Sequence, residues 1–317
     1  MMGLLDWLRP APPLDADTQA GIERAVATVD PLLRQVSGYQ EKLAPAVRHA
    51  LDYCADLAQR IPGPFEISRA AFATDPLVHA LFASADDIET MLATSRCVRE
   101  RLVEMSLGSG ECCALLGMRY HEKAGFGARL AGEIVRFDEP QRALYFTDHT
   151  LAEPSPDPEA ARARLKIAMF DGLLKGFAAH LEDVRAEQRQ LAQEQAIEQA
   201  LVRSRGVDPE SHTRRLDELR ARLSATASAL QPEGLLEALA DCLLHPEPHL
   251  RLEPIEVCVD RNGILTSAES EAGDRLRFME LTGRDPRRWV VILARIRHEE
   301  ARRALERIEA ARRYIVI

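Results

Sequence analysis

The sequence predicts an α+β protein that is mainly helical, with two small antiparallel β segments and a long projecting helical hairpin. Apolar residues recur at spacings of three and four over most of the 317 residues, and the spacing shortens toward two in two stretches. Aromatic residues make up only 5% of the chain, so aliphatic side chains must fill the interior, which favours helices. The pattern leaves open whether the two β segments form one sheet or two.

The composition restricts the class of protein. With 46% hydrophobic and 29% charged residues, the chain resembles a folded globular protein. Its net charge of -9 makes binding to nucleic acid or to an anionic membrane unlikely as a general property. The six cysteines contain no CxxC pair, and neither a secretory signal nor an apolar run of about 20 residues is visible. We therefore expect reduced thiols, no transmembrane segment and a cytoplasmic location.

Five segments follow from changes in periodicity and from proline-rich breaks. They are an amphipathic and proline-rich N-terminal segment (1–16), a helical lobe (17–107), an antiparallel β meander (108–153), a long helical hairpin (154–231) and a C-terminal α/β segment with an arginine-rich terminal helix (232–317). In the lobe, Ile22, Val26 and Val29 form an apolar stripe, and Ser84 resembles the N-cap of a helix over 85–104.

The meander is predicted from alternating residues with turn-forming residues between them. Its three strands are expected at 112–120, 129–137 and 142–148, and the turns at 123–127 and 138–141.

The hairpin is the most informative feature of the chain. Proline at position 158 begins a helix that extends to about residue 204, and 205–209 turns the chain into a return helix over 210–230. Spacings that alternate four and three indicate a coiled-coil seam, apolar at first and more polar toward the tip. The first helix carries this seam at Phe170, Leu174, Phe177, Leu181, Val184, Gln188, Leu191, Gln195, Glu198 and Val202.

Residues near the tip of the hairpin are the predicted partner-binding residues. The return helix is about half as long as its partner, so only the distal half of the seam can be covered by it. A weakly apolar seam of this kind suggests a contact that a partner protein, or a second copy of the chain, completes. The predicted residues are Val184, Gln188, Leu191, Gln195, Val202, Leu216, Leu219 and Leu223.

The C-terminal segment predicts further strands and a basic helix. Asp260-Arg-Asn-Gly263 is a strong hairpin turn signal, and the run 289–294 is apolar on both faces, as in a central strand. Residues 284–313 hold ten arginines against five acidic residues. This pattern is typical of a solvated helix face with ion pairs, and its alternative is a docking patch for an acidic partner.

One set of residues could carry chemistry. His121 and Glu122 end the first predicted strand of the meander, and Asp148 and His149 end the third. First and third strands of a meander run parallel, so these ends share one rim, where two imidazoles and two carboxylates could hold a metal ion or act as an acid–base pair. Neighbouring residues of a strand point to opposite faces, which favours ordinary polar strand ends instead.

A second string, Cys242, His245 and His249, has ligand types that suit zinc. Prolines at 246 and 248 exclude the helical geometry that such spacing requires, and no fourth ligand is near in sequence. We therefore expect no metal and no cofactor. No catalytic or nucleotide-binding motif occurs in the sequence.

Three functional hypotheses follow. The leading one is a non-enzymatic interaction or scaffold protein that acts through its helical hairpin. The second is an enzyme, or a protein that binds a small ligand or metal, with its site at the rim of His121, Glu122, Asp148 and His149. The third is binding of nucleic acid or a membrane surface through the arginine-rich terminal helix, which the overall charge opposes.

Overall fold

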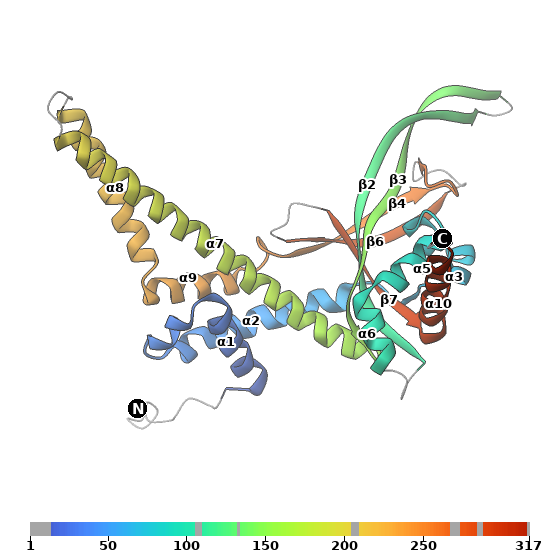
Figure 1. The fold of residues 1–317 in the computed structure, drawn as a ribbon, viewed down its shortest axis with the longest axis horizontal. Coiled ribbons are helices and arrows are strands. Elements are labelled where there is room, and N and C mark those ends of the chain that lie inside the picture. The colour runs from blue at the N-terminus through green and yellow to red at the C-terminus, as the bar shows by residue number, and fades with distance from the viewer. Residues whose placement is uncertain are drawn as a thin grey trace, which may run out of the picture. The chain divides into compact units, whose positions relative to one another are not determined.

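The computed structural model describes residues 14–104, 110–131, 134–203, 209–266, 273–283 and 288–315. The chain forms two compact units, of which unit 1 comprises 1–53 with 169–248 and unit 2 comprises 54–168 with 249–317. Figure 1 shows the helices and strands of both units, and each unit is described by itself below. Among the described residues, no helix combines the length and the apolar composition needed to cross a membrane.

Unit 1 is helical. It contains α1 (Ala16–Val29), the 3-10 helix η2 (Pro31–Gln35), most of α2 (Tyr39–Arg60), the distal part of α7 (Pro158–Arg203), α8 (Pro209–Ala229) and α9 (Pro232–Leu244). Asp15 begins α1 by accepting the backbone N–H of Thr18, as an N-cap does. The predicted stripe of Ile22, Val26 and Val29 is buried, which confirms this part of the helical reading.

Unit 2 combines short helices with a sheet. Its remaining helices are α3 (Arg69–Thr74), α4 (Pro76–Leu81), α5 (Ala85–Thr94), α6 (Arg96–Glu104) and α10 (His298–Ile315). The predicted N-cap is present, because the Ser84 hydroxyl accepts the backbone N–H of Asp87. The single helix predicted over 85–104 is instead interrupted at Ser95, whose backbone is extended. Hydroxyl side chains such as those of Thr94 and Ser95 compete for backbone hydrogen bonds, which explains the break.

Seven strands of the described part form one sheet. They are β1 (Phe65–Glu66), β2 (Glu111–Ala131), β3 (Ile134–Ser155), β4 (Arg251–Val259), β5 (Leu265–Thr266), β6 (Asp274–Thr282) and β7 (Trp289–Arg297). The order is β3-β2-β7-β6-β4-β5, with β1 parallel to β7 and the other neighbours antiparallel. A bridge between Ala143 and Ile264 joins the two ends of this order, so the sheet curls back on itself.

Both predicted β segments thus belong to one sheet, the arrangement that the sequence left open. The apolar run in β7 lies between two neighbouring strands and is buried, as predicted for a central strand. The curled sheet packs with the short helices around a core that includes Phe278, Leu116, Ile292 and Leu81.

The three-stranded meander is corrected to a two-stranded hairpin. β2 and β3 are 21 and 22 residues long, and the turn predicted at 123–127 lies within β2, where Gly125 pairs with Gln141. The second predicted turn lies within β3, where Asp138 takes a positive φ of 61° and Pro140 stays in register with Phe126. Glycine and proline also occur at irregularities and edges of strands, so they did not mark turns here.

Candidate functional site

The distal parts of α7 and α8 lie side by side in unit 1 (Figure 1). The Glu187 carboxylate accepts a hydrogen bond from Arg222 at 2.7 Å, which fixes the pairing near the base of the hairpin. Nearer the tip, Glu198 is buried and its carboxylate pairs with the His212 imidazole, with the Arg215 guanidinium 4.0 Å away. A buried carboxylate is tolerated because positive or hydrogen-bonding groups of the facing helix surround it.

The predicted partner-binding residues differ in burial. Leu191, Leu216 and Leu219 are buried. Half-buried side chains complete the same face at Val184, Gln188, Gln195 and Leu223. Val202, at the tip, is exposed. Most of these side chains are therefore covered in the folded chain, and a partner would first meet other residues.

The opposite side of α7, which we call the outer face, is exposed and nearly without charge. It consists of Ala186, Gln190, Gln193, Ala196, Ile197, Ala200 and Leu201, all of them exposed. Ile197 is 62% exposed and Leu201 is 38% exposed, although both are large and apolar. Arg189 is the charged residue on this face. The outer face is not among the residues predicted to bind a partner, which follow the apolar stripe on the other side of the helix, although its own residues recur at spacings of three and four.

His121 and Glu122 lie where β2 leaves the sheet. The ring of His121 stacks on Tyr145 with centroids 5.0 Å apart, and its Nε2 lies 2.9 Å from the hydroxyl of Thr147. The Glu122 carboxylate accepts the Tyr120 hydroxyl at 2.5 Å and Arg142 at 3.0 Å. Burial and the nearby Glu122 raise the pKa of Tyr120 to about 12, so this phenol stays protonated.

Asp148 and His149 lie in a β-bulge of β3 and have other partners. The bulge follows from the register, since Gly117 pairs with Thr150 and Arg119 with Thr147, which leaves two residues opposite one. Asp148 has a positive φ of 54° and pairs with Arg119 at 3.2 Å. The four predicted rim residues therefore do not form one site, because two strands and a bulge replace the expected parallel ends.

His149 is directed toward the helices of unit 2. Its ring stacks on Phe82 with centroids 4.5 Å apart, and its Nε2 lies 2.7 Å from the carbonyl oxygen of Leu81. A carbonyl only accepts, so Nε2 carries the hydrogen and Nδ1 is the acceptor in the neutral ring. Burial lowers the pKa of His149, which keeps the ring neutral near pH 7.

A hollow of about 410 Å³ lies beside this histidine, between the α5–α6 corner and β3. Its lining includes Met91, Ser95, Cys97, Glu100, His149 and Leu151. The Cys97 thiol donates to the Leu151 carbonyl at 3.2 Å and lies 3.2 Å from the Ser95 hydroxyl. A thiol, a hydroxyl and a neutral imidazole thus line the same hollow.

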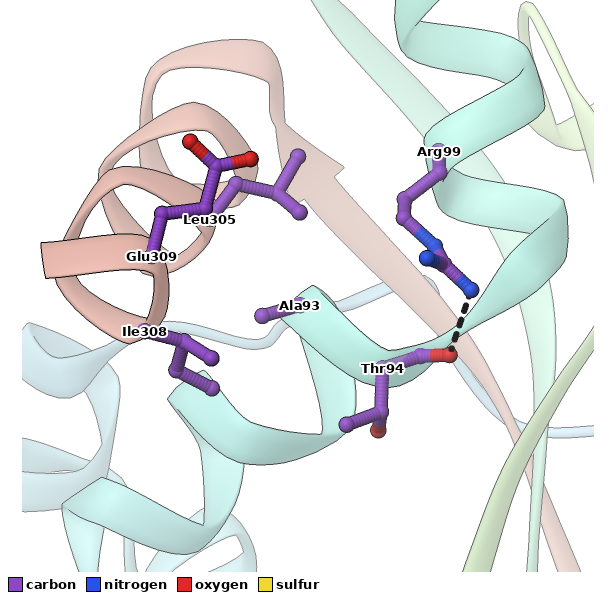
Figure 2. Close-up of a pocket in the computed structure, with 6 residues that line it drawn as sticks. All are labelled: Ala93, Thr94, Arg99, Leu305, Ile308 and Glu309. Carbon is purple, nitrogen blue, oxygen red and sulfur yellow. Dashed lines mark hydrogen bonds between the residues drawn. The ribbon is translucent and has the colours of Figure 1, made fainter. Parts of the chain in front are cut away.

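A smaller hollow of about 250 Å³ lies between α5, α6 and α10 (Figure 2). Ala93, Leu305 and Ile308 give it an apolar lining, with Glu309 and Arg99 at its margins. Arg99 donates to the carbonyl oxygen of Thr94 at 3.4 Å, as Figure 2 shows.

The remaining cysteine and histidine candidates do not converge. Burial raises the pKa of Cys54 to about 12 and that of Cys242 to about 11, so both are unreactive thiols. The Nδ1 atom of His245 lies 3.1 Å from the carbonyl oxygen of Asp241 in the preceding turn of its own helix. Across the described ranges, no three His, Cys, Asp or Glu side chains gather in a way that could hold a metal ion.

Arginines in and beside the terminal helix α10 form ion pairs with nearby glutamates. Arg303 pairs with Glu299 at 3.2 Å on α10, and Arg307 reaches Glu89 on α5 at 2.5 Å. Arg297 pairs with Glu66 at 2.7 Å. Arg284 and Arg287 lie outside the described residues. The described part of the arginine cluster is therefore laced with ion pairs, which favours a solvated face over a phosphate-binding patch.

Comparison with protein-family models, with curated proteins and with solved structures found no significant match to this chain.

Proposed function

We propose that this protein is a non-enzymatic interaction protein that binds a partner through the outer face of α7. The observation that carries the proposal is the exposure of Ile197, at 62%, and Leu201, at 38%, on a helix whose other side is already covered by α8. Large apolar side chains one helical turn apart on an exposed face are typical of a helix-binding surface. In this proposal, the pairing of α7 with α8 holds α7 in a fixed position and so keeps its outer face available to the partner.

The chemistry of the outer face indicates an amphipathic helix as the partner. Its alanines at 196 and 200 allow the backbone of another helix to approach closely, and Ile197 and Leu201 supply the apolar contact. Residues 184–222 contain eight basic and seven acidic residues in a chain of net charge -9. The net charge of this part of the hairpin is therefore close to zero. We expect the affinity for the partner to depend little on salt concentration.

A site-specific photo-crosslinker tests this proposal. Placed at Gln193 in the full chain, it should link to a specific protein in cells, and the same group at Glu218, which is exposed on α8, should not give that product. With the linked protein purified, Ile197→Lys should weaken binding at least tenfold, because a charge replaces the apolar side chain that the bound partner would cover. The affinity is measured by calorimetry or fluorescence anisotropy.

Leu244→Lys provides the matched control, since Leu244 is a similarly exposed leucine on α9 in the same unit. It should leave the affinity unchanged. Equal crosslinking from Gln193 and Glu218, or equal affinity of Ile197→Lys and the native chain, would exclude the outer face as the binding surface.

The hollow beside His149 supports a second candidate function, the binding of a small molecule. It is favoured by one observation: Cys97, Ser95 and a neutral His149 line the same hollow of about 410 Å³. A bound molecule would shield the Cys97 thiol, so ligands that raise the melting temperature should also slow its alkylation by iodoacetamide. Ligands that slow alkylation equally in the His149→Phe variant would bind elsewhere and count against this candidate.

A further inference from the structure

The buried stripes of α7 and α8 end in a polar pair. Leu191 of α7 and Leu216 of α8 are buried. Glu198 follows Leu191 at a spacing of seven residues, and His212 precedes Leu216 by one helical turn, so both stand where the apolar stripes would continue. The two side chains meet across the helices, since Nδ1 of His212 is hydrogen-bonded to the Glu198 carboxylate. Leucine at both positions would fit the same spacing, so the spacing alone does not account for this pair.

Glu198 is a buried carboxylate, with 7% of the residue exposed. Burial of a carboxylate is costly unless opposite charges and hydrogen bonds face it. The described charged groups that face it are His212 and Arg215 of α8 and Glu194, one turn earlier on α7. Arg215 is largely exposed and lies 4.0 Å from Glu198 and 3.9 Å from Glu194, so its guanidinium is shared between two carboxylates. Among the described residues, the imidazole of His212 is therefore the closest group that can bring Glu198 a positive charge.

The strength of this contact depends on the charge of the imidazole. A ring with a hydrogen on both nitrogens is a cation, and its hydrogen bond to a carboxylate is about twice as strong as one between neutral groups. A neutral ring with its hydrogen on Nδ1 still donates but brings no charge. Imidazoles exchange this proton roughly between pH 5 and 8, where guanidinium and carboxylate groups ordinarily keep their charge. A rise in pH through this range therefore takes the positive charge of His212 away from the buried carboxylate.

We propose that Glu198 and His212 form a pH-sensitive latch, which fastens the distal parts of α7 and α8 to each other more firmly at about pH 6 than at about pH 8. The sign follows from linkage, since a histidine that gains a carboxylate partner on folding stabilises the folded state at low pH and loses that effect as the pH rises.

The latch lies within the part of α7 that carries the outer face. Ile197 directly precedes Glu198 in the sequence, and Leu201 follows it by three residues. The outer face needs α7 to be held in place, so a weaker latch lowers its affinity for a partner. This consequence rests on the proposed function, whereas the latch itself rests only on the contacts of Glu198.

Hydrogen exchange of the full chain at about pH 6 and pH 8 tests the latch, with each amide corrected for its intrinsic exchange rate at that pH. Amides in 195–203 and 213–219 should be protected about fivefold more at the lower pH, because the contact then carries a charge. His212→Gln keeps a neutral donor that does not titrate, and Glu198→Gln removes the charge that favours the imidazolium. Both variants should bring the ratio of protection between the two pH values close to one.

His180→Gln is the matched control, since His180 is an exposed histidine on the same helix, and it should keep the native ratio. A native ratio of one, or a fivefold ratio that survives in His212→Gln or Glu198→Gln, would overturn the latch. The ratio remains the readout even where a variant loosens the hairpin at both pH values.

Exchange is measured on the free chain, so its outcome does not depend on any partner. With the crosslinked protein in hand, its affinity for the native chain should fall between pH 6 and pH 8 more than its affinity for His212→Gln does. A fivefold exchange ratio without any crosslinking from Gln193 would support the latch and count against the outer face, so the two failures are distinguishable.

Discussion

Asp30 shows how one side chain can serve two elements. One of its carboxylate oxygens accepts the backbone N–H of Leu32 at 2.9 Å and begins η2, and the other pairs with Arg185 of α7 at 2.5 Å. The side chain is almost buried, so neither group can be replaced by water without cost. The carboxylate therefore holds α7 against the turn that follows α1.

Replacing Asp30 should reveal both roles. Asp30→Ala removes the cap and the ion pair and should lower the free energy of unfolding by about 2 kcal/mol, whereas Asp30→Asn keeps the cap and should lose about half of that. Urea denaturation followed by circular dichroism measures both values. Equal losses in the two variants would mean that the cap contributes nothing.

His149 makes the stability of unit 2 depend on pH. Burial lowers its pKa in the folded protein below the ordinary value of about 6.5, so the unfolded chain takes up a proton first as the pH falls. The histidine thus disfavours folding progressively below about pH 6.5 and has no such effect at pH 8.

The variant His149→Gln should flatten this dependence. Between pH 7.5 and pH 5.5, the native chain should lose more of its free energy of unfolding than the variant does, because glutamine does not titrate. Thermal or urea unfolding at several pH values measures the two slopes. Parallel slopes would show that the ring does not resist protonation.

At the scale of elements, the two sides of the distal part of α7 differ in burial. On one side Leu191 is buried, as are Leu216 and Leu219 of α8, whereas the outer face, with Ile197 and Leu201, is exposed. The sequence predicted the helix, its approximate ends and the seam, because a regular spacing of three and four determines which residues share one side. It did not identify the outer face, since exposure depends on where the other helices lie.

Substitutions on the two sides of α7 and α8 should therefore behave differently. Leu219→Ala leaves a cavity in the seam and should destabilise the hairpin by about 3 kcal/mol, whereas Leu201→Ala should cost less than about 0.5 kcal/mol. Hydrogen exchange of the amides in 188–222 measures the local stability. If both variants exchanged alike, the leucines of α8 would not hold the hairpin.

At the scale of the whole chain, unit 1 and unit 2 are each built from segments distant in the sequence. Residues 1–53 join 169–248, and 54–168 join 249–317. Such interleaving makes each unit depend on both halves of the chain. The described distal parts of α7 and α8 are joined to each other by ion pairs, such as those of Arg222 with Glu187 and of Arg215 with Glu198.

Deleting 186–222 should consequently leave a folded protein. Glu187 and Arg222 are hydrogen-bonded at 2.7 Å, so a short glycine-rich linker can close the cut. We expect a cooperative melt within a few degrees of the native chain, together with loss of partner binding. Circular dichroism and calorimetry check the melt, and a broad transition without cooperativity would show that the hairpin is part of the folding unit.

The sequence by itself determined the local and periodic features: the long helix and its return, the buried strand β7 and the turn at Asp260–Gly263. These depend on side-chain spacing and turn chemistry within a few residues. The tertiary structure alone decided that β2 runs through its glycines and β3 through Pro140, and that a bulge separates His149 from His121. Both depend on register and on partners distant in the sequence, which spacing does not encode.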